Sequence, residues 1–207
     1  MAVANKIYFP QIAAGGWADW VQVVNINDQP ASVQAIARNT LGQMVWSTNA
    51  TLQPFQAWVV PVDPAYPQAD VSLTVISTRP IVGERHCHAG TEVLAFPGAS
   101  SEMKTAGTRL FFPETVYGCH DNFRFLNITE YYAFITVISR DTNGFTVRRF
   151  TNQISPLGFW IFTDVEIGNV QGTLEIFSTQ PVVGERHLHY GEAIKGVAVG
   201  QLGQVLS

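Results

Sequence analysis

The sequence contains the same segment twice, and this duplication limits the folds that the chain can adopt. The segment reads Pro80-Ile-Val-Gly-Glu-Arg-His-Cys-His88 in the first half and Pro181-Val-Val-Gly-Glu-Arg-His-Leu-His189 in the second. The residues before it also correspond, as Val75-Ile-Ser-Thr78 and Ile176-Phe-Ser-Thr179. Both halves must therefore accept the same fold.

The duplication predicts two domains. A repeat of about 100 residues is long enough to bury its own hydrophobic core. A stretch rich in Gly, Ala, Ser and Thr separates the halves. We predict a first repeat over residues 1–96, a linker over 97–107 and a second repeat over 108–207.

The pattern within each repeat is typical of β-strands. Only 14% of the residues are charged, against roughly 25% in an average protein, and β-branched and aromatic residues are frequent. Apolar and polar residues alternate in Trp20-Val-Gln-Val-Val-Asn-Ile26 and in the matching Asn122-Phe-Arg-Phe-Leu-Asn-Ile128. Later hairpin turns contain Gly42 and Gly144. We predict an all-β protein made of two tandem antiparallel β-sandwich domains with an immunoglobulin-like number of strands, roughly seven in each.

Several short motifs recur in the same order in both halves. Phe9-Pro10 is followed by Gly16-x-x-Asp19, and the half closes with Pro-x-Val-Gly-Glu-Arg; Phe112-Pro113 and Gly118-x-x-Asp121 match them in the second half. This order resembles the tandem immunoglobulin-like repeats of bacterial secreted and cell-surface proteins. The resemblance covers nearly the whole chain.

The resemblance implies a non-enzymatic module that acts in adhesion, assembly or glycan binding. Its expected partner is a polysaccharide or a protein surface, including another copy of the chain. The expected location is extracellular or at the cell surface, although the first six residues lack the basic and apolar regions of a secretory signal. A net charge of -4 without a basic cluster argues against nucleic acid as a partner. No apolar run reaches membrane-spanning length, so we expect no membrane insertion.

The histidines suggest an alternative, metal-dependent function. Alternate residues of a strand share a face, so each repeat would present one carboxylate and two imidazoles together. These are ligands for zinc, iron or copper, and the His-x-His spacing also resembles the metal motif of cupins. The alternative function is therefore that of a metal-binding protein, such as a cupin-like metal-dependent oxidoreductase. The candidate ligands are Glu84, His86, His88, Glu185, His187 and His189. The leading interpretation is structural, with no cofactor, because the Glu-Arg pair and the imidazoles can bond to neighbouring strands.

A candidate ligand-binding loop lies in the first repeat. Trp17, Asp19 and Trp20 occur where the second repeat has Cys119, Asp121 and Asn122, so the shared fold does not require either indole. Aromatic rings beside a carboxylate can stack on a sugar and accept its hydroxyl hydrogen bonds. Packing of Trp17 against the other domain or another subunit is the competing interpretation. Cys87 and Cys119 either stay free, form a disulfide or join His86, His88 and His120 in a zinc site.

Overall fold

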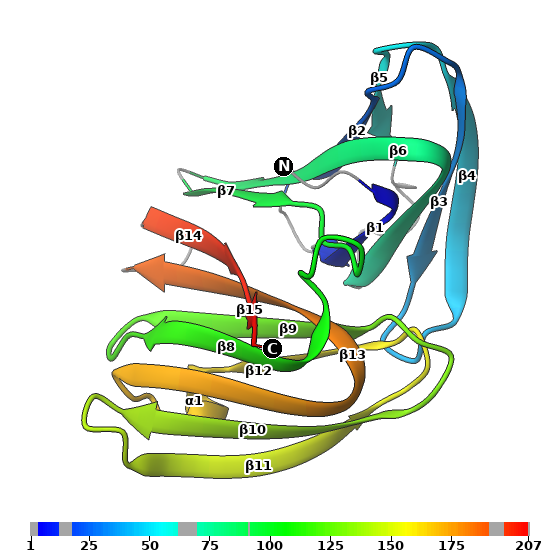
Figure 1. Ribbon diagram of the computed structural model, residues 1–207. Helices are drawn as coiled ribbons and strands as arrows, with labels where there is room; N and C mark the ends of the chain where they lie inside the picture. Colours follow the sequence, from blue (N-terminus) through cyan, green and yellow to red (C-terminus); the bar gives the residue numbers. More distant parts are fainter. Residues whose placement is uncertain (1–3, 13–17, 62–69, 91, 191–196, 207) are drawn as a thin grey trace.

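The computed structural model describes residues 4–12, 18–61, 70–90, 92–190 and 197–206. It confirms the all-β prediction. The chain forms two antiparallel sheets, one of seven and one of eight strands, and each folds into a sandwich-like unit (Figure 1). The strands of the first repeat are β1 Ala4–Ile12, β2 Ala18–Asn25, β3 Ala31–Arg38, β4 Met44–Leu52, β5 Ala57–Val60, β6 Val71–Ala89 and β7 Glu92–Pro97.

The second repeat has the same order of strands. Its elements are β8 Gly107–Thr115, β9 His120–Asn127, β10 Ala133–Asp141, β11 Thr146–Ile154, β12 Phe159–Thr163, the short helix α1 Asp164–Ile167, β13 Gly172–Tyr190, β14 Val197–Leu202 and β15 Gln204–Val205. No helix among the described residues is long and apolar enough to cross a membrane.

One long strand belongs to both layers of each repeat. The first part of β6 pairs with β1 and β3, and its second part pairs with β2 and β7. The corresponding strand β13 pairs first with β8 and β10 and then with β9 and β14. Figure 1 shows both strands curving from one layer to the other. The duplicated segment is therefore the second half of a strand that crosses the sandwich.

The β-like runs on either side of Pro80 predict two separate strands, Val71 to Ser77 and Ile81 to His88, whereas the structure has one continuous strand. The ladder with β3 ends at Ser77, and the ladder with β2 begins at Ile81. Pro80 has no N–H to donate, and it lies between the two ladders. The proline is therefore tolerated inside one continuous strand.

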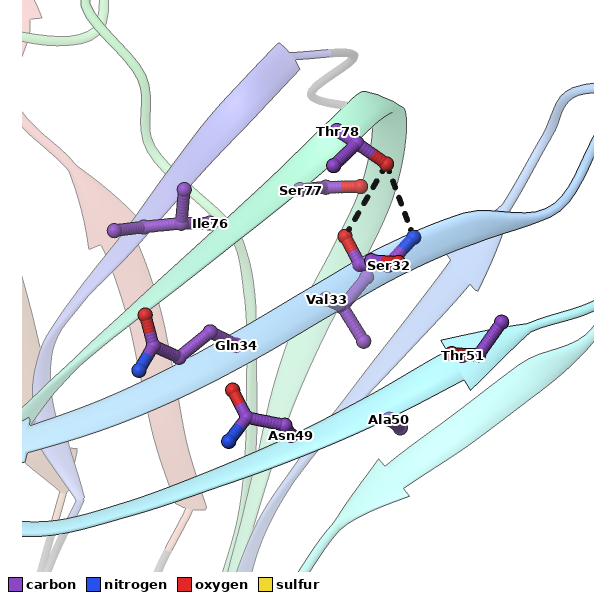
Figure 2. Close-up of a pocket in the computed structure, with 9 residues that line it drawn as sticks. All are labelled: Ser32, Val33, Gln34, Asn49, Ala50, Thr51, Ile76, Ser77 and Thr78. Carbon is purple, nitrogen blue, oxygen red and sulfur yellow. Dashed lines mark hydrogen bonds between the residues drawn. The ribbon is translucent and has the colours of Figure 1, made fainter.

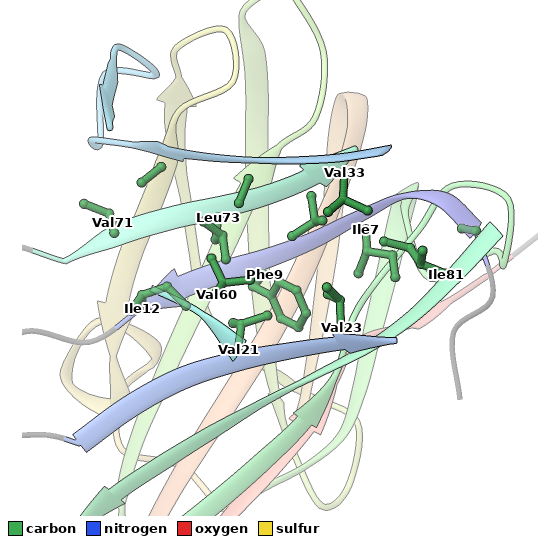
Figure 3. Close-up of a cluster of buried hydrophobic side chains, with 14 of the residues drawn as sticks. Ile7, Phe9, Ile12, Val21, Val23, Val33, Val60, Val71, Leu73 and Ile81 are labelled. Atoms are coloured by element: carbon green, nitrogen blue, oxygen red, sulfur yellow. The ribbon is translucent and has the colours of Figure 1, made fainter. Parts of the chain in front are cut away.

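Each repeat has its own hydrophobic core between the two layers. In the first repeat Phe9, Val21, Val23 and Leu73 are fully buried, and Figure 3 shows how these side chains converge. In the second repeat the core is more aromatic and contains Phe112, Phe123, Phe125 and Phe162. The alternating apolar residues of β2 and β9 thus face inward, as their period of two predicts.

A repeated asparagine closes the loop after the second strand in each half. Asn25 Nδ2 donates to the carbonyl oxygens of Gln29 and Leu52 at 2.8 and 3.1 Å. Asn127 Nδ2 donates to those of Tyr131 and Ser155 at 2.6 and 3.0 Å. Both asparagines are fully buried, so their amide groups satisfy and are satisfied by the backbone carbonyls around this loop.

The two repeats pack directly against each other. Tyr8 and Ala99 of the first half form a buried cluster with Leu126, Phe159 and Val183 of the second. Within the predicted linker, the backbone of Ala99 exchanges two hydrogen bonds with that of Tyr8, at 2.8 and 3.0 Å. This start of the linker belongs to the packed structure of the first repeat. The domain boundary over 97–107 stays a prediction.

Candidate functional site

The repeated aspartate and arginine form a buried ion pair in each half. Arg85 Nη2 lies 2.6 Å from Asp19 Oδ2, and its Nε also donates to this carboxylate. In the second repeat Arg186 Nε lies 2.6 Å from Asp121 Oδ1. The Asp19 side chain is 2% exposed. Its carboxylate therefore contacts Arg85, which differs from the solvent-facing role that we expected in a ligand-binding loop.

The Arg85 guanidinium also crosses to the second repeat. Its Nη1 lies 2.7 Å from Glu185 Oε1, and both side chains are fully buried. Burial alone would lower the pKa of Arg85, but the carboxylates of Glu185 and Asp19 outweigh burial and raise it. One arginine thus holds a carboxylate of its own repeat and one of the other repeat. Arg–carboxylate pairs with two or more contacts are directional as well as strong.

Glu185 continues this network to a buried histidine. Its Oε1 also contacts His187 Nε2, and the His187 ring stacks on Phe96 of the first repeat with a centroid distance of 4.6 Å. Burial lowers the pKa of His187 well below its usual range, and the Arg124 and Arg85 guanidinium groups lower it further. Burial also lowers the pKa of Arg124, to about 10. At neutral pH His187 is therefore an uncharged ring inside the contact between the repeats.

The glutamate and histidine at the equivalent positions of the first repeat lie at the surface. Glu84 is 55% exposed, and its Oε1 lies 2.7 Å from His86 Nε2. Trp20 stacks on both imidazoles, at centroid distances of 5.4 Å to His86 and 4.8 Å to His88. The indole is thus stacked against histidine rings of its own repeat. Trp17 lies outside the described residues, so its predicted role in ligand binding is not addressed.

The predicted metal ligands do not converge on a common point. Within the described ranges, no group of three or more His, Cys, Asp or Glu side chains is arranged to hold a metal ion. Glu185 and His187 face the other repeat, whereas Glu84 and His86 face outward. Both Cys87 and Cys119 are free cysteines in the structure. Burial raises the pKa of the Cys87 thiol to about 12, and Asp19 adds to the rise.

An open groove lies on a different face of the first repeat. It has a volume of about 570 Å³ and runs over β3, β4 and the first part of β6 (Figure 2). Gln34 and Asn49 are register partners and point out of the sheet together. Thr78 Oγ1 accepts a hydrogen bond from the Ser32 N–H at 3.0 Å, which fixes one end of the groove. The lining residues are Ser32, Val33, Gln34, Asn49, Ala50, Thr51, Ile76, Ser77 and Thr78.

The sequence interpretation did not identify this groove or the contact between the repeats. Its only signal for the ion pairs was that Asp19 and Arg85 recur together as Asp121 and Arg186. The groove had no such signal, because its polar side chains come from three strands and look like ordinary outward-facing positions. The sequence also contained no signal for Phe96, because His187, on which its ring stacks, is distant in the chain.

The comparisons with known proteins give no family and only weak structural similarities. No known family model and no curated protein matches the sequence. The structure of Thermotoga maritima 1070 is 15% identical with a TM-score of 0.44; the match covers 48% of this chain and 95% of that one. A calcium-binding mutant of Bacteroides uniformis β-glucuronidase 2 is 8% identical, with a TM-score of 0.21, over 95% of this chain and 25% of that one.

A putative β-galactosidase from Bacteroides fragilis is 10% identical, with a TM-score of 0.19, over 90% of this chain and 30% of that one. The chain thus spans less than a third of the length of either Bacteroides enzyme. Similarities at this level carry no information about a ligand or an activity. The chain is a duplicated, all-β protein of two sandwich-like repeats.

Proposed function

We propose that this protein is a non-enzymatic, extracellular or cell-surface module that binds a neutral glycan across the groove of its first repeat. The observation that supports this function is the chemistry of the groove. Its lining consists of hydroxyl, amide and small apolar side chains, without an ionisable group among them. Such a lining suits a ligand that is polar but uncharged.

The two amides provide the hydrogen bonds that a sugar needs. A glutamine or asparagine side chain offers both donors and an acceptor, which matches hydroxyl groups that donate and accept. Gln34 and Asn49 lie on adjacent strands, and Ile76 lies opposite Gln34 on the other side. Ile76 is partly exposed and supplies an apolar contact for the C–H face of a sugar ring.

The amide pair is specific to the first repeat. The register partners at the corresponding positions of the second repeat are Thr136 and Thr151. The residue that corresponds to Ile76 is Phe177, which carries the Arg109 guanidinium over its ring at 5.4 Å. Since the shared fold does not require the amides, their presence in one repeat favours a specialised role in binding.

The test compares the two repeats at equivalent positions. The double variant Gln34→Ala and Asn49→Ala removes the amides, and Thr136→Ala with Thr151→Ala is the matched control. Wild-type protein is screened on an array of neutral oligosaccharides, and the strongest hit is titrated by calorimetry. We expect the amide variant to bind at least about tenfold more weakly, because two hydrogen bonds of about 1 kcal/mol each are lost.

The control variant should bind as tightly as the wild type. The proposal is overturned if the wild type binds no neutral oligosaccharide on the array. It is also overturned if the amide variant retains full affinity, which would locate binding elsewhere on the protein.

A further inference from the structure

The contact between the two repeats is made by different surfaces of equivalent units. The second repeat contributes the outer face of β9, β12, the second half of β13 and β14, which we call the docking face. The first repeat contributes a receiving surface formed by β1, β6, β7 and the following segment. The docking face includes Leu126, Phe159, Val183, Glu185 and His187, and the receiving surface includes Tyr8, Arg85, Phe96 and Ala99. A contact between unlike surfaces leaves one surface of each kind unused.

The unused docking face is on the first repeat and is apolar for a solvent-facing sheet. Its residues at the positions of Leu126, Phe159, Val183, Glu185 and His187 are Val24, Ala57, Val82, Glu84 and His86. The neighbouring Val59, which corresponds to Ile161, is 54% exposed, and Ile26 is exposed as well. In the second repeat the corresponding Ile161 and Ile128 pack in the cluster between the repeats. On this face Val59 and Ile26 are thus exposed, unlike their packed counterparts, whereas Val82 is buried.

The unused receiving surface is on the second repeat and keeps its central cation. Phe111, Arg186, Gln201 and Gln204 occupy the positions of Tyr8, Arg85, Phe96 and Ala99. Arg186 holds Asp121 as Arg85 holds Asp19. At Nη1, where Arg85 binds Glu185, Arg186 lies 3.7 Å from Glu114, a side chain that is 61% exposed. The Arg186 side chain is 4% exposed, so a carboxylate of another molecule reaches Nη1 only when the surrounding side chains move aside.

The substitutions between the two faces are also sterically consistent. A Cβ added at Gly200 would lie 2.5 Å from the Phe96 ring, so the buried docking face requires glycine there. The unused docking face has Ala95 at this position, and the unused receiving surface has Gln201 where the other has Phe96. If these two surfaces meet, the methyl group of Ala95 lies against the flexible Gln201 side chain and not against an aromatic ring.

We propose that the docking face of the first repeat binds the receiving surface of the second repeat in another copy of the chain. Glu84 then pairs with Arg186 as Glu185 pairs with Arg85 within one chain. Val24, Ala57 and Val59 are buried in the same contact. Because the contact joins unlike surfaces, repetition extends a filament or closes a ring rather than stopping at a dimer. The glycan groove lies on β3 and β4 and stays outside this contact.

The test uses two variants that each disable one surface. Val59→Glu places a charge in the docking face, and Gln201→Glu with Gln204→Glu places carboxylates on the receiving surface beside Arg186. Val147→Glu is the matched control, because Val147 is also a partly exposed strand valine and lies on β11, away from both surfaces. Sedimentation velocity over a wide range of protein concentration gives the mass of each species, and circular dichroism checks the fold.

We expect the wild type and Val147→Glu to form species larger than dimers as concentration rises. Each disabled variant alone should stay monomeric, whereas their equimolar mixture should stop at a dimer, since only one intact contact can form. A wild type that stays monomeric at every concentration overturns the proposal. A receiving-surface variant that still dimerises alone also overturns it, because it shows that like faces meet.

If Val59→Glu is misfolded, Glu84→Lys provides the same test from an exposed side chain. Lysine at this position faces Arg186 and should weaken association at least about tenfold through repulsion of like charges. Association unchanged by this substitution contradicts the proposed pairing. Glycan binding by the groove is measured separately, so failure of the assembly does not affect the proposed function.

Discussion

Arg85 neutralises two buried carboxylates at once, one from each repeat. Its side chain is fully buried between Asp19 and Glu185. Removal of one member of such a group leaves the others charged without compensation in a medium that solvates them poorly. The arginine of the repeated Gly-Glu-Arg sequence is therefore explained by stability.

Replacement of Arg85 by alanine should lower the free energy of unfolding by about 3–5 kcal/mol, the usual cost of breaking a buried ion pair. Arg109→Ala is the matched control, because Arg109 pairs with Glu175 but its side chain is 47% exposed. That substitution should cost about 1 kcal/mol or less. Urea denaturation measures both. Equal effects of the two substitutions would contradict the role assigned to Arg85.

Cys87 should be unreactive in the folded protein. The thiol is buried, and its raised pKa of about 12 leaves little thiolate at neutral pH. In a Cys119→Ser variant, iodoacetamide should label almost no protein until urea is added, and then one thiol per chain. Mass spectrometry follows the reaction. Rapid labelling without urea would show that Cys87 is accessible.

At the scale of single residues, alternation predicted which side chains share a face but not what covers that face. Gly83, Arg85 and Cys87 are buried while Glu84, His86 and His88 are more exposed, as a period of two requires. In the second repeat Glu185 and His187 are buried on the equivalent face. The segment itself cannot encode this difference, because it arises from packing against Phe96 at a distant position.

Among the elements, the long strands β6 and β13 determine how each sandwich is closed. The sequence predicted two strands in place of β6, one on each side of Pro80, because proline cannot donate to a ladder. At the change of layer the described ladders do not use an N–H at this position, so the proline fits there. The glycine three residues after the proline is explained by a different constraint, which is steric. At Gly184 an added Cβ would lie 2.8 Å from the Phe125 ring and 2.9 Å from a Leu110 methyl group.

Gly184→Ala should therefore destabilise the protein by about 1–3 kcal/mol through overpacking of the aromatic core. Gly83→Ala should cost less, since its closest contact is a Val23 methyl group at 3.0 Å and valine is smaller than phenylalanine. Thermal unfolding of both variants against wild type gives the comparison. A larger loss of stability from Gly83→Ala than from Gly184→Ala would contradict the contacts described for these two glycines.

For the whole molecule, the duplication predicted two similar units but not their mutual arrangement. The first sign of that arrangement is a difference between the repeats, such as Phe96 against Gln201 or Gly200 against Ala95. Such differences look like neutral variation until the partner surfaces are known. Stability of the full chain therefore includes the contact between the repeats, with its ionisable groups Arg85, Glu185 and His187.

The protein should lose stability as the pH falls below about 6.5, the ordinary pKa of histidine. Because the pKa of His187 is lowered in the folded protein, the unfolded chain binds a proton first, and the stability present at neutral pH declines toward the lowered pKa. The limit is about 1.4 kcal/mol per pH unit for one group. Glu185, whose pKa is raised by burial, partly offsets the loss because it gains its proton earlier in the folded state.

The His187→Gln variant separates these contributions, since glutamine can still donate to Glu185 but does not titrate. Urea denaturation at neutral pH and at about pH 5.5 should show a smaller loss in the variant than in the wild type. Identical pH dependence would mean that another group is responsible.

The sharing of β6 and β13 between layers also determines how each repeat opens. A sandwich whose layers are joined only by loops can lose one sheet while the other persists. Here the central ladders of both layers are built on the same strand, so neither layer can dissociate without removing pairing partners from the other. Amide hydrogens at the two ends of β6, and likewise of β13, should therefore exchange with solvent through a single cooperative opening of the repeat.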